Sequence, residues 1–396
     1  MNEKLIIKNF GPIKDVELDL RKINIFIGES GTGKSTVAKL LCFCKYFSNV
    51  QGGYYEGISK QNRNIGIEEF QNNLIKWGLF EYVNEESFVS YECENYVFIF
   101  ENKISYRTFE NLMDNTYNDL ETFQLTSKIL PKTTKFKTFL NEYHKLYNEG
   151  ELTNDFFNQV RTMMDYPLFI YGERVLQSIF SMGKDFTSNL SDPLFKFFVD
   201  NDKIQRNYKT ITEIKPLEIE YKNVEGRGEI RKKGEEKFIN LNNSASGYMS
   251  VIPIVLMIKY YSEYLKKRKS FIIEEPELSI FPHTQKKVIN FLIESSPDIE
   301  NLLITTHSPY ILTSMNNLLS GFNAAKVDKG ATNKILEEKY WVNPDDVSAY
   351  MMLKDGTCED IFDREENLIK ADKIDGISEI LNLQFEELME IELVKK

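Results

Sequence analysis

The chain has 396 residues, a net charge of −11, 42% hydrophobic side chains, 28 phenylalanines and 21 tyrosines. Its length and aromatic content allow a large buried core and exclude a disordered protein. The negative charge excludes nucleic-acid binding by bulk electrostatic attraction, which leaves only a local basic groove for such a partner.

Cysteines, histidines and apolar stretches limit the class of protein further. Four cysteines, at positions 42, 44, 93 and 358, and three histidines form no zinc-ligand spacing, so we expect free thiols in a reducing cytosol. The first residues lack the pattern of a signal peptide. The most apolar stretch, 249–258, is too short to span a bilayer and contains Pro253. We therefore expect a cytoplasmic protein with no membrane partner.

Three short strands are predicted within residues 4–27. The first is centred on residues 5–7 and leads into a turn at Gly11-Pro12, and the second, over 16–20, alternates in polarity. The third strand, Ile23–Ile27, reads Ile-Asn-Ile-Phe-Ile, a short and mostly apolar run of strand type.

A phosphate-binding loop follows the third strand. Residues 28–36 read Gly-Glu-Ser-Gly-Thr-Gly-Lys-Ser-Thr, and Gly28, four residues and then Gly33-Lys34-Ser35 make the Walker A spacing. The glycines let backbone N–H groups point at phosphate oxygens, and a helix predicted over 36–46 starts at the phosphates. Lys34 can reach the β- and γ-phosphates, and the Ser35 hydroxyl can bind Mg²⁺.

This loop predicts ATP and Mg²⁺ as ligands, with Lys34 in a catalytic role; the alternative is a glycine-rich turn that binds nothing. The nucleotide-binding residues that we expect here form one segment: Gly28, Glu29, Ser30, Gly31, Thr32, Gly33, Lys34, Ser35 and Thr36.

Residues 49–165 have a different character. They are rich in Asn, Glu, Tyr and Phe, and segments such as 68–77 and 135–147 have the apolar spacing of amphipathic helices. We interpret 49–165 as a large, mainly helical insertion lobe between the N-terminal part of the ATPase core (1–48) and its C-terminal part (166–320). Within the latter, residues 215–240 alternate like strands around a basic turn that contains glycine. Residues 321–396 are expected to form an α+β extension that ends in a helix over 377–393.

A second acidic motif follows an apolar strand at 271–273. The strand ends in Glu274-Glu275-Pro276-Glu277, where open α/β sheets place their ligands. This is a Walker B arrangement, in which Glu274 holds Mg²⁺ and Glu275 orients and deprotonates the attacking water. Asp is the usual residue at the metal position, so Glu274 is a departure with a longer side chain. The alternative is a solvated acidic loop.

His307 follows the next apolar strand, 301–306, after a helix predicted over 283–294. The spacing fits one strand–helix–strand crossover, so we expect His307 beside Glu275 on the same sheet edge. An imidazole there can hydrogen-bond the γ-phosphate or the water. The other two histidines, at 144 and 283, have no such context and are interpreted as surface residues.

A further candidate phosphate contact precedes an apolar helix. Residues 243–248 read Asn-Ser-Ala-Ser-Gly-Tyr, and Ser244, Ser246 and Gly247 could present N–H groups to a phosphate. The alternative is a plain helix cap.

Together these motifs resemble the ABC-type ATPases of the RecF, SMC and OLD branch. The resemblance rests on residues 9–13 (Asn-Phe-Gly-Pro-Ile), the Walker B motif with Phe281-Pro282 and the Thr-Thr-His-Ser-Pro run at 305–309. It also rests on the 244–248 segment, which resembles the family's signature motif. The resemblance covers roughly residues 1–48 and 165–320. It implies an α/β fold, a P-loop ABC-type head with a mixed central sheet. It also implies a signature segment that reaches the partner's γ-phosphate across a dimer.

Residues 171–174 (Tyr-Gly-Glu-Arg) resemble a Glu-Arg element of OLD-like members, for which we hypothesise a link between the nucleotide site and the helical lobe. The chain has no long heptad stretch and no Toprim-like acidic cluster in 330–396. It is therefore similar to stand-alone ATPases of anti-phage systems, such as AriA of PARIS, Septu and retron-linked ATPases, which work with a separate effector.

The resemblance leaves three functions open. The first is a homo-oligomeric ATPase that controls a separate effector, expected to be a nuclease, in anti-phage defence. The second is a RecF-like DNA-repair ATPase, for which the basic stretches 227–233 and 266–269 are the candidate DNA surface, although a solvated hairpin and a helix end explain them as well. The third is the ATP-binding subunit of a membrane transporter, which the degenerate signature disfavours.

Overall fold

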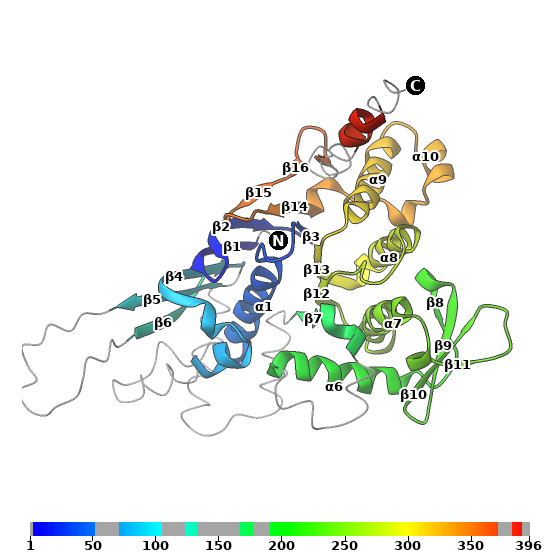
Figure 1. Ribbon diagram of the computed structural model, residues 1–396, viewed down its shortest axis with the longest axis horizontal. Helices are drawn as coiled ribbons and strands as arrows, with labels where there is room; N and C mark the ends of the chain where they lie inside the picture. Colours follow the sequence, from blue (N-terminus) through cyan, green and yellow to red (C-terminus); the bar gives the residue numbers. More distant parts are fainter. Residues whose placement is uncertain are drawn as a thin grey trace, which may run out of the picture.

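The computed structural model describes residues 3–51, 71–94, 96–104, 123–132, 167–176, 191–370 and 382–389. Its centre is a six-stranded sheet in the order β15-β14-β3-β13-β12-β7 (Figure 1). The strands are β3 (Ile23–Ile27), β7 (Leu168–Ile170), β12 (Lys269–Glu274), β13 (Ile299–Thr306), β14 (Val347–Met352) and β15 (Cys358–Asp360). All pairs are parallel except β14–β15, so the predicted α/β class with a mixed central sheet is confirmed.

Helices cover both faces of this sheet. Figure 1 shows α1 (Lys34–Gln51) on one side and α7 (Ser246–Lys259), α8 (Pro282–Glu294) and α9 (Pro309–Ala325) on the other. Two further helices, α6 (Asp192–Asn207) and α10 (Lys329–Ile335), pack on α7 and on α9, respectively. Every residue of β3 is buried, and four of its five side chains are apolar, as expected for a strand inside a parallel sheet. The exception, Asn24, is hydrogen-bonded to Arg21 and Ser348.

Two further antiparallel sheets flank the central one. The first has the order β2-β1-β4-β5-β6, and the second has the order β11-β10-β9-β8. Their strands are β1 (Glu3–Phe10), β2 (Ile13–Leu20), β4 (Val83–Glu92), β5 (Tyr96–Ile104), β6 (Phe123–Pro131), β8 (Thr212–Ile214), β9 (Ile219–Val224), β10 (Arg227–Lys232) and β11 (Ile239–Asn240). A small ribbon, β16 (Phe362–Asp363) with β17 (Leu368–Ile369), follows β15.

The described part of the 49–165 insertion corrects one expectation. The sequence predicts a mainly helical lobe, whereas β4, β5 and β6 extend the N-terminal sheet from the edge of β1. Alternating runs such as Ser87–Tyr91 bury every second residue, a strand period that the abundant polar residues obscure. Residues 71–76 are helical, as predicted, and the predicted helix over 135–147 lies outside the described residues.

Other sequence predictions are confirmed. The strands within 4–27, the helix after the glycine-rich loop, the helix–strand pair after β12 and the hairpin within 215–240 are all present. The described residues of the predicted terminal helix, 382–389, are helical. Among the described residues, none of the helices has the length and apolar character needed to cross a membrane.

The C-terminal extension takes part in the central sheet. Strand β14 lies beyond residue 320 and pairs in parallel with β3, with Val347 opposite Ile23 and Met351 opposite Ile27. The predicted boundary at 320 stays a prediction, but a strand from beyond it borders the strand that leads into the glycine-rich loop.

Candidate functional site

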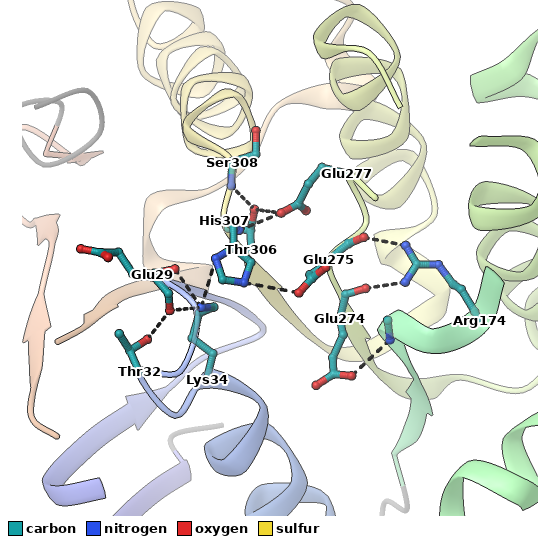
Figure 2. A network of polar contacts seen from close by, with 12 residues as sticks. Glu29, Thr32, Lys34, Arg174, Glu274, Glu275, Glu277, Thr306, His307 and Ser308 are labelled. Atoms are coloured by element: carbon teal, nitrogen blue, oxygen red, sulfur yellow. Dashed lines mark hydrogen bonds and ion pairs between the residues drawn. The ribbon is translucent and has the colours of Figure 1, made fainter. Parts of the chain in front are cut away.

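The predicted site residues gather where three parallel strands end. Thr306 at the end of β13 pairs with Ile27 of β3, and Thr305 pairs with Glu274 of β12. The residues that follow these strands, including Lys34, Glu275 and His307, therefore share one edge of the sheet (Figure 2). The expected proximity of His307 and Glu275 is confirmed, with 3.3 Å between His307 Nε2 and Glu275 Oε1.

The glycine-rich loop needs glycine for steric reasons. A Cβ on Gly28 would lie 2.5 Å from the carbonyl oxygen of Met352, and a Cβ on Gly33 would clash with the Ile13 side chain. Gly33 also has a φ of +92°, which side chains rarely adopt. The Thr32 hydroxyl donates to the Glu29 carbonyl at 2.9 Å and closes the loop. Glycine at positions 28 and 33 therefore keeps side chains out of the loop at these two points.

Lys34 begins α1 and is 5% exposed. Its Nζ donates to the carbonyl oxygens of Gly28 and Glu29, both at 2.8 Å, and lies 3.4 Å from His307 Nδ1. Burial lowers the pKa of Lys34 to about 8, and the nearby carboxylates, Glu275 first among them, oppose that shift. A nearby anion stabilises the charged form of a buried ammonium group, and a bound triphosphate would be such an anion.

Glu274 is a buried carboxylate with one oxygen left over. Its Oε2 accepts from the Gly172 N–H at 3.2 Å, and Oε1 has no hydrogen-bond partner. Ser35 lies near enough to favour the charged form of this carboxylate. Burial raises the pKa of Glu274. Oxygen donors of this kind suit Mg²⁺, which usually takes one or two protein oxygens together with phosphate oxygens and water. Ser35 and the free oxygen of Glu274 therefore fit a magnesium ion.

No larger metal centre accompanies this pair. In the part of the chain that the structure describes, no three His, Cys, Asp or Glu side chains cluster in a way that could hold a metal ion. A magnesium ion here would depend on the nucleotide for most of its ligands.

Glu275 has an unusual backbone conformation. Its φ is +45°, a left-handed value that costs about 1–3 kcal/mol for a residue other than glycine. The Glu275 N–H donates to the Thr305 carbonyl at 2.8 Å, and its own carbonyl accepts from Arg174 at 2.5 Å. These bonds hold a turn that aims the carboxylate at His307 (Figure 2). With 36% of the side chain exposed, Glu275 can still meet water or a ligand.

Glu277 orients His307, a role that sequence reasoning missed. One of its carboxylate oxygens accepts from the Thr306 hydroxyl at 2.8 Å and from the His307 N–H at 2.7 Å. The Ser308 hydroxyl donates to Gln285 at 2.6 Å and caps α9 by accepting from the Tyr310 N–H. The hydroxyl-rich Thr-Thr-His-Ser-Pro run is a signal that could have shown this anchoring.

The signature-like residues lie apart from the glycine-rich loop in their described contacts. The Ser244 hydroxyl donates to the Leu241 carbonyl at 2.6 Å, and Ser246 is the exposed first residue of α7. A Cβ on Gly247 would lie 2.8 Å from the Ser279 carbonyl, so α7 meets the loop that follows Glu275. The structure does not bring these three residues together with Lys34, and their phosphate contact stays a prediction.

The basic stretch in β10 is matched by acidic side chains. Arg231 pairs with Glu220 at 2.5 Å, and Lys233 pairs with Glu213 at 2.9 Å. Ion pairs of this kind reduce the net positive charge that a phosphate backbone would encounter. Two of the four basic side chains in 227–233 therefore have reduced charge for a DNA partner, whereas Arg227 and Lys232 are exposed.

Comparisons with known proteins agree with this geometry. A family model described as an AAA ATPase domain matches residues 1–166 and, in an overlapping match, residues 54–312. No curated protein is significantly similar to the chain. Among solved structures, an SmcHead bound to the C-winged helix domain of ScpA has a TM-score of 0.43 and 10% identity over 91% of this chain and 96% of that one. The SMC head domain from Thermotoga maritima has a TM-score of 0.41 and 13% identity over 91% of this chain and 98% of its own.

Proposed function

The chain belongs to the AAA ATPase domain family, and on this premise we propose that it hydrolyses ATP with Mg²⁺ and uses the nucleotide to control a homo-oligomer. The observation that carries the proposal is the convergence of Lys34, Glu275 and His307 at one sheet edge, next to the Ser35–Glu274 pair. These are the groups that phosphoryl transfer to water requires: a cation for the phosphates, a base for the water and oxygen ligands for a metal.

In the proposed mechanism, the terminal phosphate binds in front of the glycine-rich loop. Lys34 turns part of its hydrogen bonding from the Gly28 and Glu29 carbonyls to phosphate oxygens. Bound Mg²⁺ neutralises charge on the phosphates. Glu275 accepts the proton of the attacking water, and His307, 3.3 Å from Glu275, donates a hydrogen bond to the γ-phosphate or the water.

The position of His307 supports a switch that depends on the γ-phosphate. His307 lies between Lys34 and Glu275, at 3.4 Å and 3.3 Å, so it occupies the contacts that a terminal phosphate would share. Nucleotide binding then separates these three groups, and hydrolysis lets them return. In an ABC-type arrangement, the exposed start of α7 with Ser246 would reach the γ-phosphate of a second copy, so that ATP joins two chains and hydrolysis releases them.

We further propose that the oligomer controls a separate effector protein, a nuclease, in anti-phage defence. The support is the resemblance to stand-alone defence ATPases together with the ion-paired hairpin, which argues against DNA as the direct effector. Plaque counts test this role in cells that carry the gene with its genomic neighbours, as wild type or as Lys34→Ala. Equal protection by both versions would contradict it.

The ATPase proposal has a direct test in two variants and a control. Glu275→Gln should bind ATP like the wild type and turn over about 10²–10⁴-fold more slowly. With ATP it should accumulate as a dimer, which light scattering measures. Lys34→Ala should neither bind nor dimerise. Glu294→Gln, which changes a carboxylate at the end of α8, should keep the wild-type rate. If Glu275→Gln hydrolyses ATP as fast as the wild type, the role of Glu275 is wrong.

A further inference from the structure

Arg174 is a buried cation that the reaction described above does not use. It lies in the 3-10 turn Gly172–Leu176 directly after β7, and it is 0% exposed. Burial lowers the pKa of Arg174 to about 10, and the surrounding carboxylates, Glu277 first, oppose the shift. The guanidinium therefore stays charged at neutral pH although no water reaches it.

The guanidinium donates five hydrogen bonds, as many as it has N–H groups. Its Nε reaches the Ser250 carbonyl at 2.8 Å, and Nη1 reaches the carbonyls of Tyr171 at 3.0 Å and Glu274 at 2.6 Å. Its Nη2 reaches the Ser250 hydroxyl at 3.0 Å and the Glu275 carbonyl at 2.5 Å. All five acceptors are neutral oxygens, so Arg174 serves as a rigid connector and not as half of an ion pair.

One side of this connector is the catalytic turn. The carbonyls of Glu274 and Glu275 are consecutive, and one planar group holds both. This fixes the two peptide planes between the strand and the left-handed Glu275, whose φ of +45° would otherwise relax. Figure 2 shows Arg174 behind the turn, on the side away from His307.

The other side of the connector is α7. Arg174 binds both the carbonyl and the hydroxyl of Ser250, which lies in the second turn of this helix. The start of α7 meets the same loop again, because Gly247 packs against the Ser279 carbonyl. The described contacts thus run from Arg174 to α7, whereas the sequence hypothesis places the link at the 49–165 lobe.

We propose that Arg174 is a positioning residue that sets the backbone of Glu275 for hydrolysis and ties that turn to α7. A displacement of the α7 N-terminus, where Ser246 would meet a second copy, then changes the aim of Glu275. The effect on hydrolysis rests on the function proposed above, whereas the mechanical link between turn and helix does not.

Three variants and a control at a more exposed arginine test the positioning role. A misplaced catalytic group costs about 100-fold, so Arg174→Met should lower the single-turnover rate of ATP hydrolysis by that factor, with the ATP dissociation constant within about threefold of wild type. Arg174→Lys should lower the single-turnover rate less than Arg174→Met does. Ser250→Ala, which removes one of the five hydrogen bonds, should lower it only a few-fold. The control is Arg364→Met, because Arg364 also donates to backbone carbonyls, of Pro344 and Val347, at the opposite end of the sheet. It should leave the rate unchanged.

Hydrogen exchange tests the link without relying on activity. In Arg174→Met, amides of residues 275–280 and of residues 247–252 should both exchange faster, and neither should change in Arg364→Met. Faster exchange in only one of the two segments would overturn the link. An unchanged single-turnover rate, or equal losses of affinity and rate, would overturn the positioning role. Should Arg174→Met fail to fold, Arg174→Lys and Ser250→Ala carry the same comparisons. A wild type without ATPase activity would refute the proposed function and leave the exchange result to decide the link.

Discussion

Replacing Glu274 by Gln should raise the free energy of unfolding measured without nucleotide and lower the rate of ATP hydrolysis. The carboxylate is 5% exposed, and its Oε1 has no hydrogen-bond partner. A glutamine of the same shape can still accept from the Gly172 N–H, but it removes the buried charge. A buried carboxylate oxygen without a partner lowers the stability of the folded chain, and a bound cation would offset that cost.

The expected size follows from the contacts of this one side chain. A buried polar atom without a partner costs about 1–3 kcal/mol, and the amide recovers only part of that because its own N–H₂ meets the same surroundings. We expect a gain of about 1 kcal/mol, which for a chain of 396 residues is a rise of only about 1 °C in Tm. The loss of a metal ligand should lower magnesium-dependent turnover by about 100-fold or more.

The pH dependence of this gain has a definite sign. Burial raises the pKa of Glu274, so the folded protein keeps the proton to a higher pH than the unfolded chain. The wild type therefore loses stability as pH rises from the ordinary carboxyl range through the raised pKa of Glu274, and Glu274→Gln should lack that loss. Urea unfolding without nucleotide, from pH 4 to 8, measures both effects. A variant that is less stable at pH 7, yet hydrolyses ATP at the wild-type rate, would refute the reasoning.

Three further predictions concern other charged groups of the site and core. Burial lowers the pKa of Lys34 to about 8. The ATP dissociation constant should therefore be constant below pH 7.5 and rise by up to about tenfold per pH unit above pH 8, as the Lys34 ammonium loses its proton. A dissociation constant that stays constant up to about pH 9.5 would contradict this role of Lys34. Glu277→Gln should turn over nearly as the wild type, since its amide oxygen can accept the same two bonds, whereas Glu277→Ala should lose about 100-fold by freeing His307; equal rates for the two variants would contradict the anchoring. Lys45→Met leaves the buried Glu3 carboxylate without its 2.9 Å partner and should cost about 3–5 kcal/mol in urea unfolding, unlike Lys329→Met in an exposed pair.

The sequence predicts the central strands and the helices between them because local pattern and tertiary role agree there. The run at 271–273 is apolar throughout and the run at Ile23–Ile27 is apolar except for Asn24, a composition typical of buried parallel strands. The one-crossover spacing from Glu275 to His307 places both residues at the same edge because such crossovers return to the neighbouring strand.

The strands of the insertion could not be predicted in the same way. Strand β4 includes a polar half, Val83–Ser87, and pairs with β1 across more than 70 intervening residues. Its pairing partner, rather than its own composition, makes it a strand. The same holds for β14, whose neighbour β3 lies at the other end of the chain and which local pattern alone assigns to a separate extension.

The sequence identifies the side chains expected to contact the ligand more readily than the side chains that orient those residues. Lys34 and Glu275 belong to motifs with fixed spacing. Glu277 and Arg174 act through backbone N–H and carbonyl groups of residues distant in the chain, and no spacing rule encodes such contacts. Their roles become visible only once the strands are in register.

The most direct test of the account is a crystal structure with Mg²⁺ and a non-hydrolysable ATP analogue. The account predicts that the terminal phosphate replaces the contact between His307 and Lys34, that Ser35 and Glu274 face the metal, and that the Glu275 carboxylate lies about 3 Å from a water in line with the terminal phosphate. A structure in which Glu275 is far from the terminal phosphate in every copy would contradict the claim that these two distant segments form one catalytic pocket.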